Sequence, residues 1–113
     1  MPKKPLPPTL RERRRYIQFK VHSNKKHSRE EVVRAIWKNL HENLGTFHTS
    51  KSSAWVMDYD PKHQKGILRT NHKKQLEVKT SLTLLQDIKR EKAFISIEKV
   101  SGTIKKIRET LEK

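Results

Sequence analysis

The stretch from Ser28 to Gly45 constrains the fold most, because its pattern fits only one kind of element. Ser28 and Glu31 have the spacing of a capping box, which marks the start of a helix. Apolar residues then recur along one helix face: Val33, Ile36, Trp37, Leu40 and Leu44. Gly45 follows where a glycine commonly ends a helix. We therefore expect an amphipathic helix over residues 28–44.

Segments with the periodicity of strands lie on both sides of this helix. Residues 16–22 alternate, with Ile17, Phe19 and Val21 on one face, as in a half-buried strand. Residues 54–59 and 66–71 flank the turn signal Asp60-Pro61 and predict a β-hairpin. Residues 92–100 are rich in Phe and Ile and predict a further strand.

Two more helices complete the predicted order. Asn71 can cap a helix that runs to about Ile88, with these apolar contacts: Leu76, Leu82, Leu85 and Ile88. Residues 101–112 predict a last helix, with Ile104, Ile107 and Leu111 on one face.

The predicted order is β-α-β-β-α-β with an additional C-terminal helix. This is the split βαβ pattern of a ferredoxin-like or RRM-like α/β (α+β) fold, a four-stranded antiparallel sheet with two helices on one face. The other face of such a sheet then needs a cover, which the terminal helix, a partner or RNA can supply.

The first fifteen residues differ in composition from the rest. They hold four of the five prolines, which favour an extended chain. Thr9 and Glu12 have the spacing of a second capping box, so a short helical turn can follow. We divide the chain into a basic, proline-rich N-terminal arm, residues 1–15, and a single domain, residues 16–113. A solvated tail is the plainer alternative for the arm.

Charge is the strongest functional signal in the chain. Lys and Arg number 27 against 12 Asp and Glu, so the net charge is +15 and favours a polyanion, nucleic acid above all. No apolar stretch approaches membrane-spanning length and the N-terminus lacks the apolar core of a signal peptide. We expect a cytoplasmic protein with no membrane partner. The absence of cysteine excludes disulfides and thiolate chemistry.

Three basic clusters are candidates for binding RNA phosphates. They are Arg11, Arg13, Arg14 and Arg15 in the arm; Lys62, Lys65, Arg69, Lys73 and Lys74 around the hairpin and the next helix start; and Lys105, Lys106 and Arg108 on the last helix. Small residues at the expected start of that helix would offer backbone N–H groups to a phosphate: Ser101, Gly102 and Thr103. One lysine alone is commonly a solvated charge, but three clusters favour a collective role in RNA binding.

Base stacking on the sheet has weaker support. A sheet of the RRM kind needs aromatic residues after Lys65-Gly66, where Ile67, Leu68 and Arg69 stand. Tyr16 is then the single aromatic candidate on the first strand.

A metal site also has weaker support. Asp58 and Asp60 can share one face of a strand end and hold a divalent metal, although Asp before Pro is ordinary turn chemistry. The six histidines lie mostly in polar stretches, and we expect them to be solvated. We assign this chain no catalytic residue and no metal ligand.

Taken together, four stretches resemble the archaeal ribonuclease P protein component 2 family of ribonuclease P subunits. They are LPPTLRERRRYIQFKV at 6–21, SREEVVRAIWKNL at 28–40, KGILRTN at 65–71 and SGTIKKIR at 101–108. Each stretch is weakly specific alone, but their order and spacing cover nearly the whole chain.

The resemblance implies a ribonucleoprotein endonuclease that removes the 5′ leader of precursor tRNA. Its RNA subunit would carry the active site and the Mg²⁺ ions, and the protein would stabilise that RNA without binding a cofactor. The resemblance also implies partners: ribonuclease P RNA, protein component 3 and other subunits, with a homodimer inside a heterotetramer. Residues 54–57 are apolar on both faces, which fits a strand covered on both sides.

Two alternatives stay open at this point. One is a ribosomal or other RNA-structuring protein of the same fold. The other is a protein-only, metal-dependent nuclease that uses Asp58 and Asp60.

Overall fold

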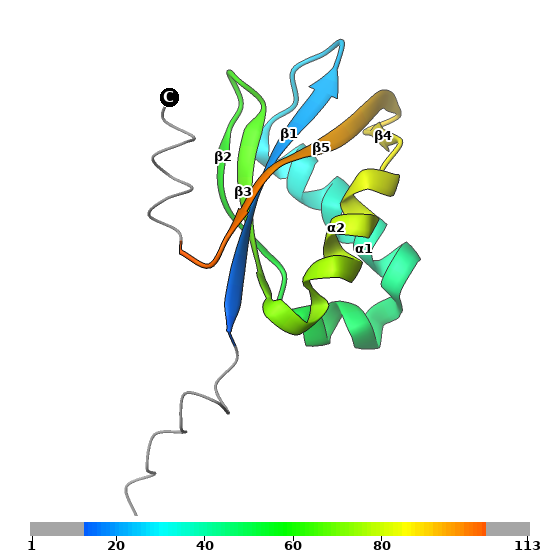
Figure 1. Ribbon diagram of the computed structural model, residues 1–113. Helices are drawn as coiled ribbons and strands as arrows, with labels where there is room; N and C mark the ends of the chain where they lie inside the picture. Colours follow the sequence, from blue (N-terminus) through cyan, green and yellow to red (C-terminus); the bar gives the residue numbers. More distant parts are fainter. Residues whose placement is uncertain (1–12, 104–113) are drawn as a thin grey trace, which may run out of the picture.

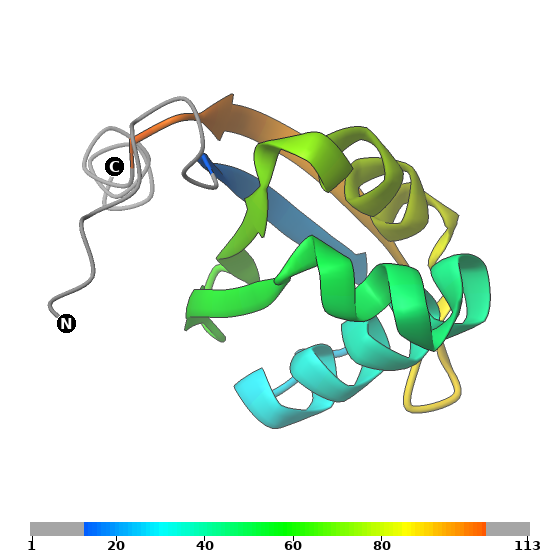
Figure 2. The ribbon, with the colours of Figure 1, turned by 90° about the horizontal axis from the view of Figure 1, so that it is seen from below.

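An antiparallel sheet of five strands organises the protein, and helices cover one of its faces (Figures 1 and 2). The computed structural model describes residues 13–103, except for the side chains of residues 47 and 48. The strand order across the sheet is β2-β3-β1-β5-β4. The elements are β1 (Arg14–Ser23), α1 (Arg29–Ser52), β2 (Trp55–Asp60), β3 (Lys65–Asn71), the 3₁₀ turn η1 (His72–Lys74), α2 (Gln75–Leu84), β4 (Asp87–Ile88) and β5 (Glu91–Ser101).

The predicted α+β class and antiparallel sheet are confirmed, but the sheet has one strand more than the predicted four. The prediction extended the second helix to Ile88, but α2 ends at Leu84. The residues after it are therefore free to form the extra strand β4. The chain instead forms a tight hairpin, in which β4 pairs with the start of β5. Ile88 still reaches the core, but Leu76 is 71% exposed, so its predicted apolar contact is wrong.

The start of α1 follows the sequence prediction. The Ser28 hydroxyl accepts a hydrogen bond from the Glu31 N–H at 3.3 Å and so caps the helix. Gly45 interrupts the helix at φ 76°, a conformation that favours glycine, but the helix then continues to Ser52. The prediction therefore placed the interruption correctly and missed the last part of the element. Among the helices in residues 13–103, none is long and apolar enough to cross a membrane.

The core lies between the sheet and the helices. Ile17, Phe19 and Val21 of β1 are buried there, as the alternation predicted. The most buried residues of α1 are Val32, Ile36 and Leu40, so Ile36 and Leu40 are confirmed, while Val32 was missed and Trp37 lies outside the core cluster. Val33 and Leu44 pack at its margin.

The outer face of the sheet, opposite α1 and α2, is also buried at its centre. Gln18 of β1 and Ile67 of β3 are paired in register and are both buried, although neither belongs to the core under the helices. Within the described residues, the Gln18 Oε1 atom has no hydrogen-bond partner. The predicted helical turn of the arm and the predicted last helix lie outside the described residues.

Gly66 of β3 permits close packing against Phe19 of β1 and the β2 backbone. A Cβ atom at this position would lie 2.5 Å from the Phe19 ring and 3.0 Å from the Asp58 carbonyl oxygen. Both distances are shorter than normal contacts, so a side chain here would displace either the core ring or the β2 backbone. The Lys65-Gly66 pair that suggested an RNA-binding motif thus has a packing explanation.

Gly66→Ala should lower the free energy of unfolding by about 1–3 kcal/mol, the usual cost of overpacking a core. Urea unfolding monitored by circular dichroism measures this change. Gly102→Ala is the control, because its Cβ would lie 3.4 Å from the nearest atom, Nη1 of Arg15. Equal stability of the two variants would contradict the packing role of Gly66.

Candidate nucleic-acid interface

Strand pairing places the start of β1 beside the end of β3. Arg14 pairs with Asn71 in the ladder, and the His72 N–H donates a hydrogen bond to the Arg13 carbonyl at 2.7 Å. The Asn71 side chain accepts from the Lys74 N–H at 2.9 Å and begins η1, so it is a cap as predicted. The arginines before β1 and the lysines after β3 therefore lie at the same end of the sheet.

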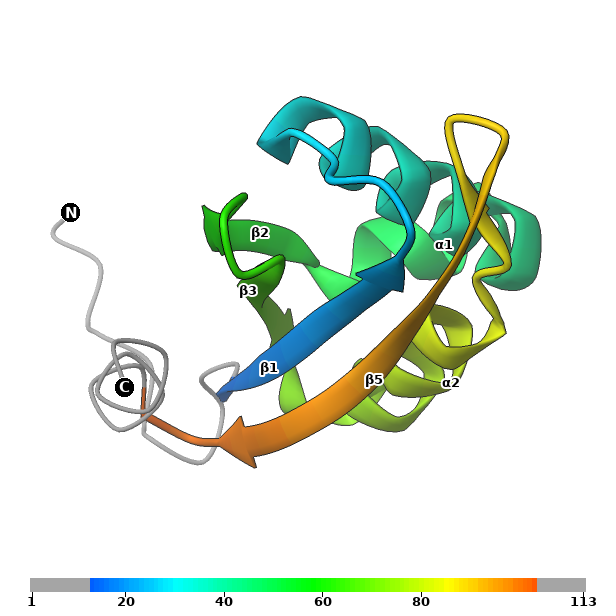
Figure 3. The ribbon, with the colours of Figure 1, turned by 90° about the horizontal axis from the view of Figure 1, so that it is seen from above.

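The end of β5 lies at this same end of the sheet, on the side of β1 opposite to β3. Tyr16 pairs with Ser101, and the guanidinium of Arg15 lies beside Gly102. Figure 3 shows the start of β1 and the end of β5 side by side. Segments separated by most of the chain thus meet at one end of the sheet. We call this set the basic end: Arg13, Arg14, Arg15, Arg69, Lys73, Lys74, Ser101, Gly102 and Thr103.

The cations of the basic end differ in exposure. Arg13, Arg14 and Lys73 are exposed, while Arg15 is half-buried and donates a hydrogen bond to the Arg14 carbonyl at 3.2 Å. Lys74 forms an ion pair with Glu77 at 3.4 Å, so part of its charge is already neutralised. Arg14 and Arg15 belong to β1, and the strand therefore begins two residues before its predicted start at Tyr16.

Some predicted residues lie elsewhere. Lys65 pairs with Lys20 and Asp60 at the opposite end of β3. Ser101 is the last residue of β5 and accepts a hydrogen bond from the Thr103 N–H at 3.1 Å, where a helix start was predicted. The following predicted residues lie outside the described part of the chain: Arg11, Lys105, Lys106 and Arg108.

Aromatic residues lie beside the basic end on the outer face of the sheet, opposite α1 and α2. Trp55 of β2 lies opposite Arg69 of β3, and Arg69 lies opposite Tyr16 of β1. Trp55 is 55% exposed. Sequence reasoning left Tyr16 as the single aromatic candidate on the sheet, and it missed Trp55 because the register of β2 was unknown.

The metal-site alternative gains no support from the geometry. The Asp60 carboxylate accepts a hydrogen bond from the Lys62 N–H at 2.9 Å and contacts Nδ1 of His63 at 2.6 Å. The hydrogen bond from His63 holds the pKa of Asp60 below its usual value. In residues 13–103, no group of three His, Asp or Glu side chains lies close enough to hold a metal ion. Asp60 instead stabilises the β2–β3 turn.

His27 departs from the solvated state that was predicted for the histidines. His27 is 3% exposed, and its ring contacts the Glu31 carboxylate at 3.0 Å and the Ser23 hydroxyl at 3.1 Å. Its backbone N–H donates to Oε1 of Gln64 at 3.1 Å. His27 therefore joins the β1–α1 connection to the β2–β3 hairpin. The signal in the sequence was the capping-box residue Glu31, which lies one helical turn after His27.

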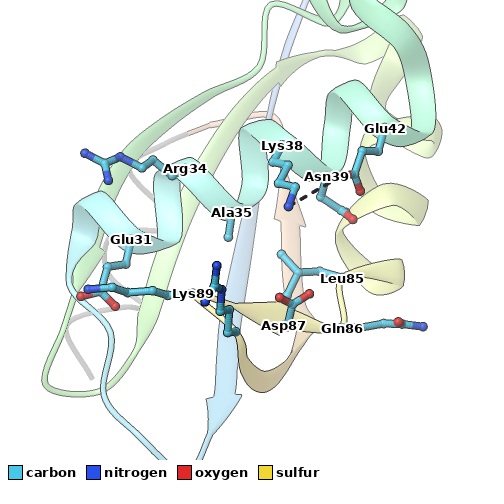
Figure 4. Close-up of a pocket in the computed structure, with 11 residues that line it drawn as sticks. Glu31, Arg34, Ala35, Lys38, Asn39, Glu42, Leu85, Gln86, Asp87 and Lys89 are labelled. Carbon is cyan, nitrogen blue, oxygen red and sulfur yellow. Dashed lines mark ion pairs between the residues drawn. The ribbon is translucent and has the colours of Figure 1, made fainter.

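A pocket between α1 and the β4 hairpin has a different charge pattern. Figure 4 shows cations and carboxylates interleaved around it, with Lys38 and Glu42 forming an ion pair at 4.0 Å. The pKa of Glu31 is lowered, first by the hydrogen bond from His27 and also by the charge of Lys89. Because opposite charges alternate here, this pocket suits a polyanion less than the basic end does.

The fold and the basic end define a small, positively charged α+β protein suited to a polyanionic partner. The model of the Rpp14/Pop5 family matches residues 15–112, and the chain belongs to this family. The predicted resemblance is confirmed.

Relatives agree with the family assignment, and a solved structure shares the fold. Ribonuclease P protein component 2 of Pyrococcus furiosus is 42% identical over 93% of this chain and 88% of its own length. The component 2 protein of Methanococcus aeolicus is 42% identical over 94% of this chain and 77% of its own. A chain in the cryo-electron microscopy structure of yeast ribonuclease MRP has a TM-score of 0.66 to this protein at 14% identity. The match covers 97% of this chain and 95% of the yeast chain, and it shows a shared fold.

Asp60→Asn should reduce the loss of stability in acid. A folded-state pKa below the unfolded value stabilises the protein above the unfolded pKa, and this contribution disappears as the pH falls through the folded pKa. Urea unfolding at pH 7 and at about pH 3 should show a smaller difference for the variant than for the wild type. Glu98→Gln removes an exposed carboxylate of β5 and serves as the control. An unchanged difference in Asp60→Asn would contradict the role of the His63 hydrogen bond.

Proposed function

We propose that this chain is a protein subunit of ribonuclease P, the ribonucleoprotein that removes the 5′ leader of precursor tRNA. Membership in the Rpp14/Pop5 family and the component 2 relatives support this assignment. The observation that carries the RNA-binding role is the convergence of three separated segments at the basic end.

The basic end would act through phosphate contacts. Folding a catalytic RNA brings phosphates close together, and their repulsion opposes the compact state. Arginine and lysine side chains neutralise phosphates and release condensed counterions, so they favour the compact RNA. The protein therefore stabilises the active form of the RNA, and the RNA and its Mg²⁺ ions perform the cleavage.

We also propose the finer features of the assembly. Ribonuclease P protein component 3 and other subunits would bind this chain, with a homodimer inside a heterotetramer and precursor tRNA as the substrate of the cytoplasmic holoenzyme. Exposed apolar side chains supply surface for protein contacts: Trp55 and Leu76. The strands β2-β3-β1-β5 with α1 and α2 would form the split βαβ unit, with β4 as an addition at its edge.

Addition of this protein to ribonuclease P RNA, together with component 3, should accelerate cleavage of precursor tRNA over the RNA alone. Neutralisation of phosphates should also lower the Mg²⁺ concentration needed for half-maximal rate. Single-turnover cleavage of labelled precursor tRNA over a Mg²⁺ titration measures both effects.

The same assay separates the alternatives. Lack of acceleration, with recovery of ribosomal RNA in a pull-down from cell extract, would favour a ribosomal or other RNA-structuring protein. Cleavage by the chain without any RNA subunit, abolished by Asp58→Asn, would instead favour a protein-only nuclease.

Replacing Arg13, Arg14 and Arg15 with Ala should weaken RNA binding and reduce its salt dependence. The log–log slope of affinity against salt should fall by up to about three units, and by less if some side chains miss a phosphate. Filter binding of ribonuclease P RNA over a salt series measures the slope.

A matched control removes three cations elsewhere. Lys26→Ala, Arg34→Ala and Lys38→Ala together change the net charge equally on the β1–α1 connection and α1. Thermal unfolding should show that both triple variants fold. An equal fall in slope for both would mean that net charge, and not the basic end, determines binding.

A further inference from the structure

Phe94 of β5 is a large apolar side chain presented to solvent at the end of the sheet away from the basic end. It is 57% exposed and lies opposite His22 of β1 in the strand register. The two rings are stacked, with centroids 4.4 Å apart and planes inclined by 7°. Both side chains lie on the outer face of the sheet, because their neighbours Val21, Ala93 and Ile95 point into the core.

A side-chain hydrogen bond and the strand backbones fix the orientation of this ring pair. Nε2 of His22 forms a hydrogen bond with the Ser96 hydroxyl at 2.8 Å, and Ser96 is the next residue of β5 on the same face. Neighbouring strands restrain both backbones through the ladder. The pair is therefore a preorganised flat surface, with the Phe94 ring available to a further planar group.

The surroundings of the pair are positively charged. The open pocket beside it includes Lys20, Lys62 and Lys92 together with His63. None of the described residues lining this pocket is acidic, in contrast to the α1–β4 pocket. Two carboxylates lie near it. That of Asp60 is engaged by His63 and the Lys62 N–H. Asp87, opposite Lys92 in the ladder, lines the α1–β4 pocket instead. An exposed aromatic ring bordered by lysines fits a nucleotide, with a planar base and a negative phosphate.

We propose that the His22–Phe94 pair is a stacking platform for one unpaired base of the bound RNA. A base lies on the Phe94 ring, and Lys20, Lys62 and Lys92 bind the phosphates on either side of it. Bases of single-stranded RNA commonly stack on aromatic side chains in this way. The inference rests on the proposed RNA-binding function and adds to it a second contact of a different kind.

The platform and the basic end lie at opposite ends of β1. Arg14 and His22 are eight residues apart on one strand, a separation of about 26 Å at the usual rise per residue. A folded RNA that reaches both would place paired, phosphate-rich helices at the basic end and an unpaired nucleotide at the platform. Stacking recognises the base itself, so the platform would discriminate single-stranded from paired RNA.

The test uses a short unstructured RNA, a fluorescein-labelled 12-nucleotide strand, and the full chain in a fluorescence anisotropy titration. Phe94→Ala should weaken binding about 5- to 150-fold, the range for loss of one stacked base. Phe94→Tyr keeps a ring and should bind within about twofold of wild type. The salt slope should stay unchanged in Phe94→Ala and fall by about 0.7 for each lysine replaced by Ala that contacts a phosphate.

A control variant and a control ligand separate stacking from general effects. Leu84→Ala removes an apolar side chain of α2 that is 54% exposed, and it should bind the strand as wild type does. A blunt RNA duplex of the same length should bind wild type and Phe94→Ala equally, because its bases are not available for stacking. Circular dichroism should show that each variant is folded.

The outcomes distinguish this proposal from the proposed function. Equal binding of the single strand by wild type and Phe94→Ala would overturn the platform and leave the RNA-binding function standing. If Phe94→Ala binds RNA normally but fails to assemble with component 3, the pair is a protein contact and the platform is wrong. If wild type binds neither probe nor ribonuclease P RNA, both proposals fail.

Discussion

The position of β1 between β3 and β5 is the constraint on which the rest of the structure depends. Backbone hydrogen bonds to both neighbours fix its register, and a slip by one residue would exchange its core face for its outer face. One end of β1 brings Arg15 next to Gly102, and the other brings His22 next to Phe94. A single strand thus places two chemically different surfaces at a fixed distance.

Irregularities in the neighbouring strands keep this arrangement compatible with a core. Phe19 lies opposite Ile97 while Ile17 lies opposite Val100, so the register of β5 shifts by one residue between them. The shift is needed because Ile97 and Val100 are separated by an odd number of positions and would otherwise point to opposite faces. A similar shift in β2 lets Val56 pack beside Leu68 and still leaves Asp58 on the outer face.

Much of the fold could be predicted because local patterns and tertiary packing agree there. The Ser28 cap and the alternation of Ile17, Phe19 and Val21 describe local geometry that packing then reinforces. The end of α2 could not be predicted, because Leu85 and Ile88 have helical spacing but reach the core from a loop and from β4. Of the candidate site, the residue types were predictable, but their partners across strands required the register.

The sequence by itself determined the charge, the family and, apart from β4, the order of the strands and α-helices in residues 13–103, since these depend on composition, on ordered motifs and on short-range periodicity. Only the tertiary structure decided which charges act together. Lys65 and Arg69 are close in sequence but lie toward opposite ends of β3, whereas Arg15 and Gly102 are distant in sequence and adjacent in space. The physical reason is that strand register joins segments across the whole chain, and no local pattern encodes it.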